Sequence, residues 1–123
     1  MKLQNDFYEI QSERKTENGG VYELKLNAEH FVYKAHFPSQ PITPGVCVLQ
    51  MAVELFSTCL QKEIRLVKVN NLKFTSILSP VETPFVTYAF QKITEENGLL
   101  KAQILVEQNS VVYAKISITC TVA

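Results

Sequence analysis

The sequence predicts an α+β protein in which an antiparallel sheet of about six strands wraps around one long central helix. The helix is indicated by residues 46–61, which are apolar almost all round, as in helices buried on most of their sides. The strands are indicated by segments that alternate apolar and polar residues and are separated by turn-forming residues. The expected order of elements is β-β-α-β-β-β-β.

The first two strands are predicted to form a hairpin. Residues 7–15 and 21–26 are its arms, and Asn18-Gly19-Gly20 supplies the turn. In the second arm, apolar residues alternate with charged ones, so one face of the hairpin is expected to contact water. In the helix that follows, residues 45–53 carry no charge, and the first helical turns are therefore expected to be the most deeply buried.

Four further strands are expected after the helix, over residues 64–74, 85–93, 99–107 and 112–122. The segment Glu95-Glu96-Asn97-Gly98 is predicted to be the hairpin turn between the second and the third of them. The last strand has the clearest pattern, because apolar residues occupy every second position along its length. These strands complete the predicted sheet.

Length and composition indicate a single domain over residues 1–123, with 46% hydrophobic residues to form its core. The 12 basic and 12 acidic residues balance, which argues against a nucleic-acid-binding protein with a basic face. The first residues show no apolar signal core, and the longest apolar run is too short to cross a bilayer. The three cysteines lack C-x-x-C spacing, so we expect neither a metal cluster nor a disulfide framework, and we expect a reducing, cytoplasmic location.

The segment directly before the helix has the features of a binding site. It contains His36, three prolines and Gly45. Thr43 is expected to cap the helix and Pro44 to be its first residue. The backbone N–H groups of Gly45 and Val46 would then lie at the positive end of the helix dipole, where they can hold an anion or a polarised carbonyl oxygen. The alternative is that Thr43 caps both groups.

The side chains around this segment allow several interpretations. His36 can exchange protons near neutral pH or be a structural histidine, and His30 is expected to pack at a strand end. Gln50 can donate and accept hydrogen bonds but cannot act as an acid or base. Glu54 lies on the same helical face as Gln50, and it either reaches into a site or marks where the helix meets solvent. Cys47 is a candidate thiol nucleophile, although a cysteine on an apolar helix is typically a small core residue.

Residues 35–50, which read A-H-F-P-S-Q-P-I-T-P-G-V-C-V-L-Q, resemble the signature of the 3-hydroxyacyl-acyl-carrier-protein dehydratases. That signature is approximately G-H-F-P-G-x-P-x-x-P-G-x-x-x-x-E, and the family has the hot-dog fold. Residues 30–34 are similar to the strand that precedes the motif in the family, and residues 71–74 and 78–80 are similar to its later strand and loop. In this chain the acidic residue at the end of the motif is replaced by Gln50.

The resemblance implies a mechanism on a 3-hydroxyacyl thioester carried by the phosphopantetheine of acyl carrier protein or CoA, without a further cofactor or a metal. His36 would remove a proton from C2, and the Gly45 amide would polarise the thioester carbonyl. Phe37, Val46 and Leu49 would contact the substrate. In the family a helix carboxylate helps to expel the 3-hydroxyl, and the two catalytic side chains come from opposite subunits of a dimer. The product would enter fatty-acid or related lipid or polyene synthesis.

Gln50 leaves three interpretations open, because a lost general acid commonly reduces the rate by a factor of about 10² to 10⁴. His36 handles both proton transfers, or Glu54 substitutes from the next helical turn, or the chain is a non-catalytic subunit. Such a subunit would bind acyl carrier protein or complete the site of an active homologue in a heterodimer. A hot-dog thioesterase, with Glu54 activating water, is a further alternative. Homodimer, heterodimer and higher oligomer all remain possible.

Overall fold

The computed structural model describes residues 2–35 and 39–123, and within them the chain forms six strands and two helices. The strands are β1 (Tyr8–Thr16), β2 (Gly19–Leu26), β3 (Ile64–Phe74), β4 (Phe85–Glu96), β5 (Leu99–Gln108) and β6 (Val111–Val122). The helices are α1 (Phe31–Ala35) and α2 (Gly45–Leu60). Apart from α1, this is the predicted order of elements.

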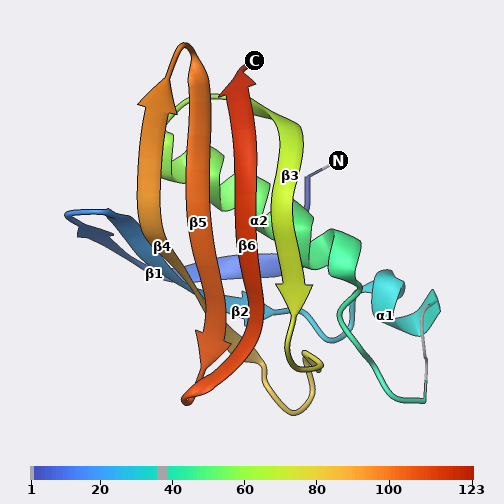
Figure 1. Ribbon diagram of the computed structural model, residues 1–123. Coiled ribbons are helices and arrows are strands. Elements are labelled where there is room, and N and C mark those ends of the chain that lie inside the picture. Colours follow the sequence, from blue (N-terminus) through green and yellow to red (C-terminus); the bar gives the residue numbers. More distant parts are fainter. Residues whose placement is uncertain (1, 36–38) are drawn as a thin grey trace.

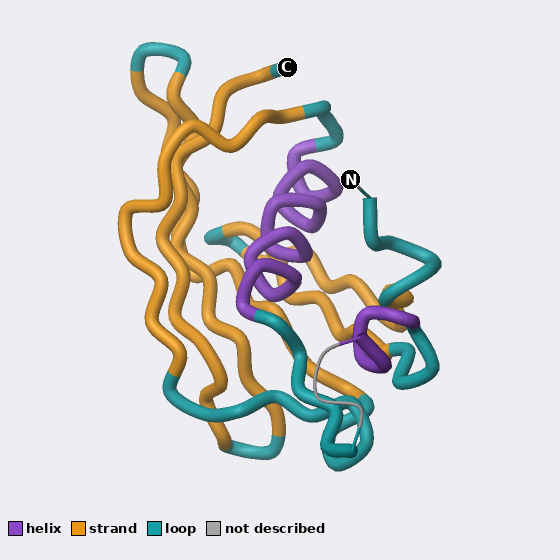
Figure 2. Tube along the Cα trace, turned by 90° about the vertical axis from the view of Figure 1, so that its right-hand side faces the viewer, coloured by secondary structure: helices purple, strands orange, loops and turns teal. Residues whose placement is uncertain are grey.

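All six strands form one antiparallel sheet in the order β1-β2-β4-β5-β6-β3. The long helix α2 lies across one face of this sheet (Figure 1). A view turned by 90° shows the sheet curving around the helix (Figure 2). The predicted α+β arrangement, with six strands around one long helix, is confirmed. Neither helix in the described part of the chain has the length and apolar character needed to cross a membrane.

The core fills the space between α2 and the inner face of the sheet. The helix contributes one face, consisting of Cys47, Val48, Met51, Ala52, Leu55 and Phe56. The sheet contributes alternate residues, among them Leu100, Ala102, Ile104 and Val106 of β5 and Ala114, Ile116, Ile118 and Cys120 of β6. Removing one such aliphatic side chain from water stabilises the fold by about 1.5–3 kcal/mol, so this contact determines where α2 lies.

The first turns of α2 are not its most deeply buried part, and this prediction is wrong. Val46 is 66% exposed, and Leu49 and Val53 are half-buried, whereas Met51 is fully buried. The reason is that the sheet of the same chain covers only one face of the helix. The all-round apolar pattern therefore describes a helix with a second apolar face that its own chain leaves partly uncovered.

Residues 31–34 belong to helix α1 and do not form the strand that the family resemblance implied. Local hydrogen bonds explain the difference. His30 Nδ1 accepts a bond from the N–H of Val32 at 3.1 Å, and Asn27 Oδ1 accepts one from the N–H of Glu29 at 3.0 Å. Side-chain acceptors of this kind satisfy backbone donors locally and so compete with a strand ladder.

Tight turns join the last three strands. Asn97 and Gly98 between β4 and β5 have φ angles of 54° and 78°, and Asn109 and Ser110 between β5 and β6 have φ angles of 51° and 67°. Two successive positive φ angles are typical of type I′ turns, whose twist matches that of the flanking strands. The first turn is shorter than predicted, because β4 continues to Glu96.

Tyr88 connects the sheet to the helix, because its buried hydroxyl donates a hydrogen bond to the Val48 carbonyl oxygen at 2.9 Å. Burial raises the pKa of Tyr88, so the hydroxyl remains a donor. We expect Tyr88→Phe to lower the free energy of unfolding by about 1 kcal/mol in urea denaturation. Tyr113→Phe is the control, since the Tyr113 hydroxyl contacts the Thr83 hydroxyl at 3.1 Å in a partly exposed place. Equal losses in the two variants would contradict this role of Tyr88.

Candidate functional site

Helix α2 begins at Gly45, and Pro44 is its N-cap with φ −61° and ψ 144°. The prediction that Thr43 caps the helix and Pro44 is its first residue is therefore wrong, and among the described residues no side chain caps this end. The N–H groups of Cys47 and Val48 donate to the Pro44 carbonyl oxygen at 3.0 and 3.1 Å. The amides of Gly45 and Val46 precede this first turn of hydrogen bonds and point out of the helix end.

Thr43 instead fixes the loop that leads into the helix. Its hydroxyl lies 2.9 Å from the Tyr33 hydroxyl in a buried contact, and its N–H donates to the Leu78 carbonyl oxygen at 2.8 Å. Burial raises the pKa of Tyr33 to about 12, although the bond to Thr43 opposes this rise. The loop is thus tied to α1 and to the segment after β3. The predicted base His36 and the predicted contact residue Phe37 lie outside the described residues.

Gly45 lines a mainly apolar hollow of about 160 Å³ beside the start of the helix. Its walls include Ile42, Val48, Phe74 and Leu78. The Phe74 ring approaches so closely that a Cβ atom at position 45 would lie 2.8 Å from its Cζ. A residue without a side chain therefore lets the ring and the helix end meet. The predicted contact residue Val46 is exposed on a different side of the helix.

Gln50 and Glu54 line a second, more polar groove of about 350 Å³, together with Gln4, Val53 and Ser57. Five residues correspond to about 140° of rotation around a helix, so Gln50 points away from the hollow beside the helix start. No described residue lines both the hollow and the groove. One chain by itself therefore does not bring the Gly45 amide and the Gln50 side chain into one pocket.

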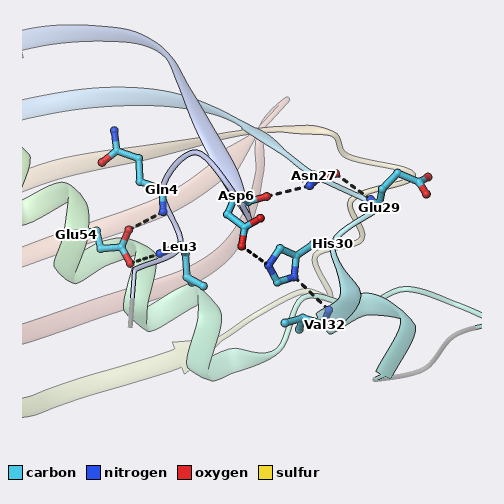
Figure 3. A network of polar contacts seen from close by, with 8 residues as sticks. All are labelled: Leu3, Gln4, Asp6, Asn27, Glu29, His30, Val32 and Glu54. Carbon is cyan, nitrogen blue, oxygen red and sulfur yellow. Dashed lines mark hydrogen bonds and ion pairs between the residues drawn. The ribbon is translucent and has the colours of Figure 1, made fainter.

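Four groups of the described residues donate hydrogen bonds to the Glu54 carboxylate. These groups are the N–H groups of Leu3 and Gln4 at 2.8 and 2.9 Å, the Tyr8 hydroxyl at 3.0 Å and Gln50 Nε2 at 2.9 Å. Figure 3 shows the two backbone bonds, which join the N-terminal segment to α2. Burial raises the pKa of Tyr8, and the nearby carboxylate raises it further, so the hydroxyl stays a donor. Glu54 is thus a partly buried anchor, and it does not simply mark the point where the helix meets solvent.

His30 is held as a structural residue at the start of α1. Its Nε2 lies 3.0 Å from Asp6 Oδ2, and its Nδ1 accepts the Val32 N–H (Figure 3). Because Nδ1 accepts, the neutral ring carries its proton on Nε2 and donates it to Asp6. The ring centroid lies 5.1 Å from that of Phe7 and 4.7 Å from that of Phe31. The expected packing role is present, but at a helix start and not at a strand end.

The buried cysteines have the properties of core residues. Burial raises the pKa of Cys47, and it raises the pKa of Cys120 to about 11, so both thiols stay protonated at neutral pH. A protonated thiol is a poor nucleophile, which disfavours the thiol interpretation of Cys47. No group of three or more potential metal ligands occurs among the described residues.

Several residues of this region gave no signal in the sequence. Leu3 and Gln4 bind Glu54 through backbone groups, which any residue possesses. Tyr8 and Tyr33 contribute buried hydroxyls, but a tyrosine in an amphipathic segment only indicates a partly buried position. Phe74 was expected only as the end of a strand. Their roles follow from which segments the fold brings together.

The chain belongs to the ApeI-like dehydratase family, because the model of that family, described as ApeI dehydratase, matches residues 12–115. It is also similar to the 3-hydroxyacyl-acyl-carrier-protein dehydratase FabZ of Rickettsia africae, with 27% identity over 75 residues. This match covers 54% of the chain and 50% of the relative, so the chain spans about half the length of that curated protein. The resemblance to the dehydratase family is confirmed.

Solved structures share the fold. The dehydratase heterocomplex ApeI:P from Xenorhabdus doucetiae has a TM-score of 0.63 and 19% identity, with 98% of this chain and 99% of that chain covered. A hypothetical thioesterase with coenzyme A from Streptococcus pneumoniae TIGR4 has a TM-score of 0.68 and 11% identity, with 94% and 85% covered. An uncharacterized protein from Erwinia carotovora subsp. atroseptica has a TM-score of 0.59 and 19% identity, with 91% of each chain covered. At these identities the likeness concerns the fold alone, which is the predicted hot-dog fold.

The bond between Tyr33 and Thr43 is expected to stabilise the loop that carries the motif. Tyr33→Phe and Thr43→Val each remove one partner of this buried contact. In a double-mutant cycle followed by urea denaturation, we expect a coupling free energy of about 1 kcal/mol between the two positions. Simple additivity of the two losses would contradict a direct bond, and the cycle measures this without reference to activity.

Proposed function

We propose that the chain is a dehydratase that eliminates water from 3-hydroxyacyl thioesters, carried on acyl carrier protein or CoA, in the synthesis of fatty acids or related lipids. The observation that carries this proposal is the start of α2 at Gly45, which no side chain in the described part of the chain caps and which lies beside an apolar hollow in a chain of the ApeI-like dehydratase family. Backbone amides at a helix start stabilise a developing enolate oxygen, and an apolar hollow accepts an acyl chain.

His36 is the proposed carrier of the proton in both directions. It takes the C2 proton, the C2–H electron pair forms the C2=C3 double bond, and the C3–O bond breaks. The hydroxyl then leaves as water with the proton that His36 returns, so the step is balanced without a second acid. This assignment is supported by Gln50, which cannot supply a proton, and by Glu54, whose oxygens already accept four bonds.

The proposed active form is a dimer. The hollow beside Gly45 and the groove beside Gln50 lie on different sides of the same helix. A second copy is therefore needed to place a Gln50 side chain opposite a Gly45 amide. The apolar residues Val46, Leu49 and Val53, which their own chain leaves partly uncovered, support an interface at this helix face.

The activity is tested by following conversion of a 3-hydroxyacyl thioester to the 2-enoyl product. We expect turnover by the wild-type chain and a loss of about 10²- to 10⁴-fold in His36→Ala, because that variant lacks the acid–base group. Cys47→Ala is the matched control and should retain activity, since the Cys47 thiol is buried and protonated. Equal turnover by His36→Ala and the wild-type chain would remove His36 from the mechanism.

The proposed dimer is tested with Val46→Glu. A buried carboxylate at this position would disfavour association, so we expect a shift from dimer to monomer in size-exclusion chromatography with light scattering. The matched control is Val111→Glu, because Val111 is also exposed but lies at the β5–β6 turn, away from α2. A wild-type chain that is monomeric, or a Val46→Glu variant that remains dimeric, would contradict the proposed interface.

A non-catalytic partner subunit is the second candidate, and Gln50 is the residue that favours it. The chain shares its fold with a dehydratase heterocomplex, and that complex is a precedent for such pairing. In this case the purified chain alone would bind an acyl thioester without turnover, and activity would appear only with an active homologue. Release of free thiol without formation of the enoyl product would instead indicate a thioesterase.

A further inference from the structure

Charge is distributed unevenly over the chain, although its formal net charge is zero. The four adjacent strands β4, β5, β6 and β3 contain three of the 12 acidic residues, Glu95, Glu96 and Glu107. They contain six of the 12 basic residues, namely Arg65, Lys68, Lys73, Lys92, Lys101 and Lys115. This part of the sheet therefore has an excess of positive charge, and the rest of the chain has an equal excess of negative charge.

The six basic residues lie on the outer face of the sheet, which is the face turned away from α2 (Figure 2). Lys115 shows this directly, because its neighbours Ala114 and Ile116 are buried on the inner face and successive side chains of a strand alternate between faces. The other five are register partners of residues on the outer face, in the pairs Lys73–Lys115, Lys68–Thr119, Lys101–Thr119, Arg65–Thr121 and Lys92–Gln103. Glu96 and Glu107 stand near the ends of their strands, so the middle of the outer face is basic.

Two of these lysines repel each other in the folded sheet. Lys73 and Lys115 are directly opposite on β3 and β6, and both side chains are exposed. Like charges in this arrangement destabilise a sheet, and the partner of Lys115 on β5 is the uncharged Leu105. The ion pairs of the described residues do not involve this face, since they are Lys15–Glu13, His30–Asp6 and Lys34–Glu29. The repulsion is therefore one that an external anion would offset.

Two hollows on the outer face are lined by hydrogen-bond donors. The larger one, of about 570 Å³, has Lys115, Gln103 and Ser117 in its wall. The smaller one, of about 280 Å³, has Lys92 and Lys101 in its wall and shares Gln103 and Ser117 with the larger one. In the described part of the chain, no carboxylate lines either hollow. Ammonium, amide N–H and hydroxyl groups all donate to phosphate oxygens, so this lining favours a ligand that bears phosphate.

We propose that the outer face of the sheet docks on the surface of a phospholipid bilayer that contains anionic lipids. The ammonium groups of Lys73 and Lys115 bind lipid phosphates, which offset their mutual repulsion. The amide of Gln103 and the hydroxyl of Ser117 donate to further headgroup oxygens. Helix α2 lies on the opposite side of the sheet, so the candidate site at its start faces away from the bilayer. This docking is independent of the proposed dehydratase function.

The composition of the outer face favours a bilayer over a protein or a nucleic acid. Five of its six basic residues are lysines, whereas protein interfaces are enriched in arginine and depleted in lysine. The larger hollow also includes Leu105 and Val112, which are half-buried apolar side chains. A lipid interface accepts such side chains beside lysines, but the phosphate backbone of a nucleic acid does not. A bilayer surface also requires no matching shape, because its attraction for basic residues is electrostatic.

The first experiment measures partition of the full chain onto vesicles of phosphatidylcholine and phosphatidylglycerol in equal parts. We expect binding that weakens as salt is added, and no binding to vesicles of phosphatidylcholine alone. The double variant Lys73→Gln/Lys115→Gln should lower the partition coefficient about 20-fold, because each lysine near the surface contributes about fivefold. Absence of binding by the wild-type chain to the anionic vesicles would overturn the proposal.

The matched control is Lys34→Gln/Lys62→Gln, which changes the net charge by the same amount. Lys34 lies in α1 and Lys62 follows α2, so both exposed side chains are outside the outer face. Attraction to the bilayer falls off within a Debye length, and the partition coefficient of this control should therefore stay within about twofold of the wild-type value. An equal loss in the two double variants would show that net charge alone explains binding and would overturn the assignment to this face.

Competition with soluble polyanions distinguishes the bilayer from the other partners. Duplex DNA and polyglutamate are added to the vesicle-bound chain at the same concentration of negative charge as the anionic lipid. We expect most of the chain to remain on the vesicles, because neither polymer offers an interface for Leu105 and Val112. Displacement by DNA would assign the face to nucleic acid, and displacement by polyglutamate would assign it to an acidic protein. Either result would overturn the lipid assignment.

The last experiment measures melting temperature without lipid. Lys115→Gln removes the repulsion with Lys73, so we expect the melting temperature at low salt to rise by about 1–4 °C. Added salt screens the wild-type pair and should reduce this difference. Stability that rises while vesicle binding falls would show that the lysine pair serves binding and not folding. A Lys115→Gln variant that melts below the wild-type chain would remove the repulsion on which the proposal rests.

Discussion

The packing of one face of α2 against the curved sheet is the contact on which the rest of this structure depends. It fixes the start of the helix near the end of β3, where Phe74 closes on Gly45. It also determines which helix residues remain outside the core, because a helix that buries one face must present the other. The apolar hollow, the polar groove and the uncovered face with Val46 are consequences of this single placement.

Glu54 is the clearest case of a residue whose type suggested one role and whose surroundings define another. A carboxylate near a predicted active site is readily interpreted as a general acid or base. In the fold, its oxygens accept donors from the N-terminal segment, from β1 and from Gln50 of its own helix. These bonds tie three segments together. A carboxylate used in this way contributes by fixing geometry, and the chemistry is left to groups around it.

The fold was largely predictable because apolar and polar residues alternate along its strands. The strand over residues 64–74 has the predicted bounds, and the alternation along β6 describes its buried face. The predictions that failed concern segments whose conformation depends on side-chain hydrogen bonds or on which surfaces of α2 the sheet covers. α1 forms because His30 and Asn27 accept backbone N–H groups nearby, and Thr43 does not cap α2 because its hydroxyl contacts that of Tyr33. Such pairings depend on distance in space, which the order of residues does not contain.

The sequence by itself determined the fold class, the family resemblance and the absence of an acidic residue at position 50, because periodicity and spacing along the chain carry this information. It also identified Gly45 at the helix start. Only the tertiary structure decided that Gly45 and Gln50 face different sides of the helix, and that Glu54 anchors the N-terminal segment. The physical reason is that hydrogen bonds and cavities arise between segments far apart in the chain, and their partners are chosen by packing.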